Sequence, residues 1–141
     1  MQRITILCQG RLKEKHYIEA CREYMKRLSA WCQPEIIELP ENGDVVSRIP
    51  RGAFVIAMCI EGDKTDSPGL ARRLARCALE GDSRVCFLIG GSEGLPQAAK
   101  ELADWRLSMS DMTFPHHLAR VMLLEQIYRA FTINAGTKYH K

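Results

Sequence analysis

The sequence predicts an α/β protein with a mostly parallel β-sheet and helices on both faces of that sheet. Residues 53–60 and 85–89 are apolar at every position, which is typical of strands buried on both faces of a parallel sheet. Such segments alternate with segments whose apolar residues recur every three or four positions, as in amphipathic helices. A chain of 141 residues can form one core, so residues 1–141 are interpreted as a single domain.

The amino-terminal elements are bounded by glycine and proline. Gly10 ends the first strand, and the helix after it has one apolar stripe and a basic opposite face, interpreted as solvated surface rather than as a phosphate contact. Pro34 ends the helical region, and the polar connection 40–52 has room for one helical turn around 45–49. The expected strands are 3–9, 35–39, 53–60, 85–89 and 105–108, and the expected helices are 13–31, 67–80, 96–103 and 115–134.

Capping residues mark where the later helices begin. A loop is expected at 61–64, followed by Ser67 as the N-cap and Pro68 as the first residue of the second helix. Pro96 and Pro115 are expected to begin the third and fourth helices, because proline is tolerated in a first turn.

Three glycines follow the strand 85–89 and predict a ligand-binding turn. Gly90, Gly91 and Gly94 permit a tight turn and close backbone approach at the carboxyl end of a strand, where open α/β sheets bind their ligands. The order of these glycines matches neither the dinucleotide fingerprint nor the phosphate-binding loop of nucleotide hydrolases. A turn without a ligand is the alternative.

The last helix is apolar nearly all round, interrupted by few polar residues. A helix on the outside of a domain needs only one apolar stripe, so this helix is expected to be covered on both sides. We expect a homodimer contact to supply part of that cover.

Composition indicates a cytoplasmic protein. The sequence has no apolar run long enough for a membrane span, and its start lacks the features of a signal peptide. Its six cysteines form no C-x-x-C pair and lie mostly in apolar runs, so they are interpreted as reduced core residues. The histidines show no metal-ligand spacing, so no metal is expected. His116 and His117 are interpreted as residues of a helix start.

Four motifs in this order resemble the RlmH family of SPOUT-class methyltransferases, which act on a pseudouridine of 23S rRNA. They are FLIGGSEGL at 87–95, LSMSDMTFPH at 107–116, EQIYRA at 125–130 and YHK at 139–141. The resemblance implies a carboxyl-terminal trefoil knot around 85–135, a homodimer and S-adenosylmethionine as the methyl donor. Carried over by position, the cofactor-binding residues would be Met58, Gly90, Met109, Ser110, Asp111, Met112, Thr113 and Phe114.

The reaction implied by this resemblance is methylation of N3 of pseudouridine, which must lose its proton as the methyl group arrives. Arg129 would stabilise the anion or bind a phosphate, and His140 would accept the proton, with Tyr139 and Lys141 beside it in the tail. The tail is expected to reach the site from the second subunit.

Two departures and several alternatives remain open. His117 stands where the family commonly has Gln or Pro, and the connection 40–52 is shorter than in other members. The partner is expected to be the ribosome or its 23S rRNA. Alternatives are another RNA such as tRNA, a ribosome-binding protein without catalysis, and an unrelated small-molecule-binding dimer.

Overall fold

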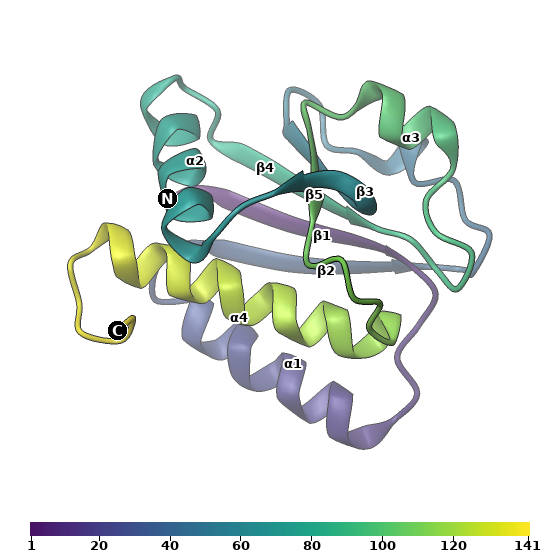
Figure 1. Ribbon diagram of the computed structural model, residues 1–141, viewed down its shortest axis with the longest axis horizontal. Coiled ribbons are helices and arrows are strands. Elements are labelled where there is room, and N and C mark those ends of the chain that lie inside the picture. Colours follow the sequence, from purple (N-terminus) through teal and green to yellow (C-terminus); the bar gives the residue numbers. More distant parts are fainter.

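The computed structural model describes all 141 residues, and its five parallel strands form one sheet in the order β2-β1-β4-β3-β5 (Figure 1). The strands are β1 (Arg3–Gln9), β2 (Gln33–Leu39), β3 (Phe54–Lys64), β4 (Arg84–Ile89) and β5 (Trp105–Ser108). The helices are α1 (Lys15–Leu28), the 3-10 turn η1 (Val46–Arg48), α2 (Ser67–Leu79), α3 (Gln97–Leu102) and α4 (His116–Asn134). The predicted α/β class, the parallel sheet and the helical turn near 45–49 are confirmed.

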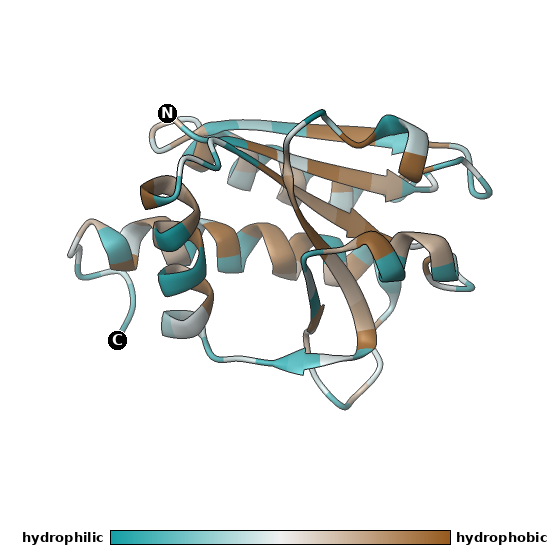
Figure 2. Ribbon diagram, turned by 90° about the horizontal axis from the view of Figure 1, so that it is seen from above, coloured by the Kyte–Doolittle hydropathy of each residue, from teal (hydrophilic) through white to brown (hydrophobic).

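Both faces of the sheet are buried, and the alternation of side chains divides the core in two. Ile6 and Phe87 point to the larger core, which α1, α2 and α4 cover. Leu7 and Leu88 point to the smaller core, covered by α3 and by the segment that includes η1. The strands are accordingly hydrophobic along most of their length (Figure 2). Residues alternate between the faces because successive side chains of a strand point in opposite directions.

The end of β3 differs from the prediction. The expected loop 61–64 belongs to the strand, because Asp63 and Lys64 pair with β5 after a break in register that begins at Met58. Gly62 lies within this irregular stretch, where a Cβ would stand 2.7 Å from the backbone of Arg106. Met58 and Asp63 both pair with Leu107, so the residues between them are extra residues of β3 that have no partner in β5, as in a β-bulge.

Two terminal assignments also differ from the structure. Asp66, not Ser67, is the N-cap of α2, because its carboxylate accepts a hydrogen bond of 2.7 Å from the amide of Gly69. Pro34 lies inside β2 rather than before it. β2 is an edge strand, where a residue without an N–H group is tolerated.

α4 lies against the sheet between α1 and α2, and it contributes Leu123, Leu124 and Ile127 to the larger core (Figure 1). None of its residues from His116 to Ile133 is fully exposed. Several of its apolar residues, including Val121, Met122 and Phe131, are only partly buried in one chain, and the expected homodimer contact stays a prediction. None of the helices combines the length and the apolar character that crossing a membrane requires.

Candidate active site

Three loops at the carboxyl edge of the sheet enclose a cavity of about 510 Å³. The loops follow or belong to β3, β4 and β5, whose carboxyl ends meet at one edge because the strands are parallel. Residues 58–61, 89–95 and 108–116 line the cavity, and Lys100 and Ala119 complete it. Asp111 is the one residue inside these ranges that does not contribute.

The glycine turn after β4 has no room for a side chain at Gly90. A Cβ on Gly90 would lie 2.4 Å from backbone atoms of Gly94 and Leu95, so this position requires glycine. Gly94 adopts a φ of +80°, in the left-handed region that other residues rarely adopt, and forms an isolated bridge with Gly91. The turn is thus folded back on itself beside the cavity.

Side chains from the first half of the chain hold this turn. The carboxylate of Glu41 accepts hydrogen bonds from the amide of Ser92 at 2.8 Å and from its hydroxyl at 3.2 Å. These hydrogen bonds from Ser92 lower the pKa of Glu41. Gln9 accepts from the amide of Gly91 through Oε1 and donates through Nε2 to the carbonyl of Gly43 at 2.9 Å. Sequence reasoning missed Glu41 and Gln9, because no local pattern links them to a turn 50 or more residues away.

The loop 109–115 forms the opposite wall. The Ser108 hydroxyl donates to the carbonyl of Ser110, and the Ser110 hydroxyl accepts from the amide of Met112 at 3.0 Å. These hydrogen bonds hold the loop in one conformation, and the side chains of Met109 and Phe114 line the cavity as an apolar wall. The wall is therefore apolar, with hydroxyl and backbone groups close by.

Seven of the eight predicted cofactor residues line this cavity, and Asp111 does not. Asp111 instead forms an ion pair with Lys64 at the end of β3, on the exposed surface. The seven that are brought together are Met58, Gly90, Met109, Ser110, Met112, Thr113 and Phe114.

Among the titratable side chains that line the cavity is one imidazole, that of His116. Burial, and then the neighbouring His117, lower the pKa of His116, although Glu41 and Glu14 oppose that shift. The sequence interpretation placed His116 in a helix start, which is correct, but gave it no place in the site. Glu61 and Lys100 form an ion pair of 2.6 Å at the cavity rim.

The predicted catalytic residues cluster at the other end of α4. Arg129 donates to Glu125 at 2.9 Å, and its Nη1 lies 3.1 Å from Nδ1 of His140. Because a guanidinium can only donate, Nδ1 of His140 accepts, which places the imidazole proton on Nε2. The Tyr139 hydroxyl also donates to Glu125, and this bond raises the pKa of Tyr139 to about 12. Lys141 is exposed and makes no ion pair.

This cluster is far from the cavity within one chain. α4 runs antiparallel to the strands, so its first residue lies at the carboxyl edge and its last at the opposite edge (Figure 1). Arg129 is thirteen residues after His116 on the helix, a separation of about 20 Å. One chain therefore does not bring the tail residues to its own cavity.

A match to a family described as predicted SPOUT methyltransferase covers residues 2–140. A ribosomal RNA large subunit methyltransferase H from Acetivibrio thermocellus is 42% identical over 158 positions that cover 99% of each chain. The protein of that name from Clostridioides difficile is 43% identical and is matched over 98% of this chain and 99% of its own. The 158 aligned positions outnumber the 141 residues here, so the relative carries segments that this chain lacks.

Solved structures show the same fold at low identity. A probable methylase family protein from Haemophilus influenzae superposes with a TM-score of 0.61 at 12% identity, covering 99% of this chain and 70% of its own. A tRNA methyltransferase from Aquifex aeolicus gives a TM-score of 0.55 at 16% identity, covering 91% of this chain and 69% of its own.

Proposed function

Because the chain belongs to the SPOUT methyltransferase family, we propose that it transfers a methyl group from S-adenosylmethionine to N3 of a pseudouridine in 23S rRNA. The observation that carries the proposal is the cavity in which three loops of the carboxyl edge meet, lined by seven of the residues that the resemblance assigns to the cofactor. The names of relatives 42–43% identical to the whole chain support ribosomal RNA as the substrate.

The cavity fits S-adenosylmethionine in size and chemistry. Its volume of about 510 Å³ is in the usual range for a small-molecule site. Met58, Met109 and Phe114 offer apolar walls. The glycine turn would offer the adenosine backbone groups other than the amides of Gly91, Ser92 and Gly94, which already bond within the chain. When bound, the cofactor supplies an electrophilic methyl group on a positively charged sulfur.

The residues of the chain must align N3 with that methyl group and accept the N3 proton. Two imidazoles are candidates for the acceptor. His116 lines the cavity, and its lowered pKa keeps it neutral near pH 7. His140 already uses Nδ1 to accept from Arg129, so it would have to give up that contact either to accept a proton on Nδ1 or to change tautomer and accept one on Nε2. Arg129 would then stabilise the imide anion.

A homodimer would complete the site, with the tail of one subunit reaching the cavity of the other. The separation of about 20 Å along α4 supports this arrangement, since neither chain can use its own tail. We also expect the trefoil knot of the family around residues 85–135, and a cytoplasmic location with the ribosome as partner. The connection 40–52 is where we expect the segments that the relatives carry and this chain lacks.

The test is transfer of tritium from methyl-labelled S-adenosylmethionine to large ribosomal subunits that lack the modification, followed by nucleoside digestion. Label in N3-methylpseudouridine is the expected result. Label only in tRNA would redirect the proposal to the tRNA alternative. Binding of subunits without any transfer, at cofactor concentrations that saturate the protein, would favour the non-catalytic alternative.

A further inference from the structure

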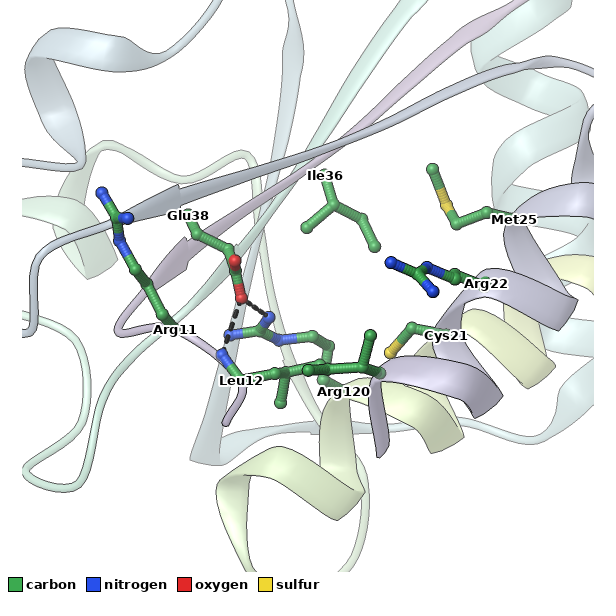
Figure 3. A pocket seen from close by; sticks show the side chains of 9 residues that line it. Arg11, Leu12, Cys21, Arg22, Met25, Ile36, Glu38 and Arg120 are labelled. Atoms are coloured by element: carbon green, nitrogen blue, oxygen red, sulfur yellow. Dashed lines mark hydrogen bonds and ion pairs between the residues drawn. The ribbon is translucent and has the colours of Figure 1, made fainter. Parts of the chain in front are cut away.

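A second cavity, of about 590 Å³, lies between α1 and β2, and the proposed reaction does not use it (Figure 3). Its lining is partly apolar, with Met25 and Ile36 among the side chains that form the bed. Four charged side chains accompany this bed, namely Arg11, Arg22, Glu38 and Arg120.

The charged floor of this cavity is a fixed structure. Arg120 is 2% exposed, and it donates through Nη1 to Glu38 and through Nη2 to the carbonyl of Gly10 at 3.2 Å. Glu38 also accepts from the amide of Leu12 at 2.8 Å. Both hydrogen bonds of Glu38 use Oε2, so Oε1 is left as an acceptor held in place at the cavity.

Arg11 and Arg22 lie on opposite sides of the cavity, with Ile36 between them and Met25 beside Arg22 (Figure 3). Both side chains are exposed and neither has a carboxylate partner. Two other cations of α1 are paired, since Lys15 contacts Glu19 and Arg27 contacts Glu23, whereas Lys26 forms no ion pair and lines neither cavity. A guanidinium group without an ion-pair partner is suited to a phosphate, which it can bind with two hydrogen bonds.

The two cavities share the first turns of α4 as a wall. His116 and Ala119 line the cavity of the proposed active site, and Arg120, the next residue, lines the second cavity. The two cavities are therefore neighbours, close enough for adjacent nucleotides of one polymer to occupy both.

We propose that the second cavity binds a nucleotide of the RNA substrate that neighbours the methylated one. Its base lies on the apolar bed and donates an amino or imino hydrogen to Oε1 of Glu38, as bases with exposed N–H groups do to carboxylates. The phosphates on its two sides lie against Arg11 and Arg22, at opposite ends of the cavity. The inference rests on the proposed function, because that function supplies the RNA.

The test compares two double variants that each remove two unpaired cations. Arg11→Ala with Arg22→Ala removes the cavity arginines, and Lys13→Ala with Lys26→Ala removes two cations that line neither cavity. Binding of each protein to unmethylated 23S rRNA is measured over a series of KCl concentrations. We expect the arginine variant to lose roughly tenfold or more in affinity, with its salt slope reduced by about two. We expect the RNA affinity of the lysine variant to fall less than threefold. Both variants should keep the cofactor affinity of the wild-type protein.

Three results would overturn the inference. Equal losses in the two double variants would mean that general charge, and not the cavity, attracts RNA. Dissociation of a dimer in the arginine variant would mean that the cavity is a contact between copies. If the arginine variant keeps its RNA affinity while the wild-type protein methylates the RNA, the second cavity does not bind RNA, and the proposed function still stands. A wild-type protein that binds through the arginines without methylating would instead refute the proposed function and leave the cavity standing.

Discussion

At the scale of single residues, Gly90 is the position with the least tolerance beside the cavity. An added Cβ would meet backbone atoms of Gly94 and Leu95 at 2.4 Å, and backbone cannot move aside as a flexible side chain can. We expect Gly90→Ala to weaken cofactor binding roughly tenfold or more and to cost about 1–3 kcal/mol of unfolding free energy. Calorimetric titration with the cofactor and urea unfolding would measure the two effects.

Gly52→Ala is the matched control for this prediction. Gly52 has a φ of +76°, so alanine is strained there too, but no atom lies within 4 Å of the added Cβ. We expect some loss of stability with unchanged cofactor affinity. Equal weakening of cofactor binding by both variants would mean that the crowding at Gly90 is unimportant.

His116 carries a pH prediction at the same scale. Burial, then the charges of His117 and Arg120, lower its pKa below 6.5, while Glu41 and Glu14 work in the opposite direction. If His116 accepts the N3 proton, the rate rises with pH below 6.5 and is level at pH 7, where the imidazole is neutral. His116→Asn should lower kcat roughly a hundredfold and remove that rise. His117→Asn, which alters a neighbour paired with Glu14, should keep it.

The stability of the fold should change with pH in the same window. The unfolded chain protonates His116 near its ordinary pKa of 6.5, whereas the folded chain resists protonation. Lowering the pH through 6.5 therefore favours the unfolded state until the folded pKa is reached.

The same variants decide which histidine accepts the N3 proton. If His140→Asn loses the increase of rate with pH and His116→Asn keeps it, the proton acceptor is His140 and not His116.

At the scale of elements, the pair of Glu38 and Arg120 joins β2 to α4. The side chain of Arg120 is 2% exposed, and Glu38→Gln leaves it without a negative partner. We therefore expect this variant to lose about 3 kcal/mol of unfolding free energy. Arg120→Met should cost less, because the Glu38 side chain is 32% exposed and water can solvate it. Urea unfolding of both variants at pH 7 measures the difference. A larger loss in Arg120→Met would contradict this account.

This pair also has a defined pH dependence. Burial alone would raise the pKa of Glu38, but hydrogen bonds from Leu12 and Arg120 and the charge of Arg120 outweigh it, and the pKa is lowered. The stabilisation is therefore complete above the ordinary pKa of 4.5 and is lost as the pH falls through the folded pKa. The wild-type protein should lose this stabilisation as the Glu38 carboxylate is protonated in acid. Glu38→Gln has no carboxylate at this position and should not show that loss.

The elements themselves were largely predictable from sequence. Strands such as β4 are buried on both faces and are therefore continuously apolar, here from Val85 to Ile89, and helices such as α1 carry one apolar stripe. The extension of β3 through Lys64 was not predictable, because polar residues 61–64 continue the strand only through pairing with β5. Asp66 and Ser67 are both good caps, and only the three-dimensional bond to Gly69 selects Asp66.

At the scale of the whole molecule, the resemblance predicted which residues line the cavity but not what holds them. Glu41 supports the glycine turn from a distant connection, and this contact exists only after the sheet has formed. Asp111 shares a loop with lining residues, yet it points to Lys64 at the surface. Loop membership is visible in a sequence, whereas the direction of each side chain depends on its tertiary neighbours.

The proposed shared site gives a prediction for mixed dimers. Gly90→Ala damages the cavity of its own chain, and Arg129→Ala damages the tail of its own chain. If each cavity uses the partner's tail, a dimer of one chain of each kind has one intact site. At a cofactor concentration too low to occupy the Gly90→Ala cavity, random mixing of the two variants should then restore about a quarter of the wild-type activity, because half of the dimers are mixed and each has one working site of two.

Methyl transfer assays after subunit exchange would measure this recovery. A mixture that stays inactive would mean that each tail serves its own cavity. Sedimentation at micromolar concentration checks the premise, since a monomer would remove the shared site altogether.

The distribution of thiols has a practical consequence. Five of the six cysteines are buried, and the sixth, Cys59, is half-buried and lines the cavity of the proposed active site. Burial raises its pKa, so mildly alkaline buffer is suitable for labelling. The native protein should take up one maleimide quickly and five more only on unfolding, and S-adenosylmethionine should slow the first. Cys59→Ala should abolish the quick reaction, so the chain carries its own chemical reporter of cavity occupancy.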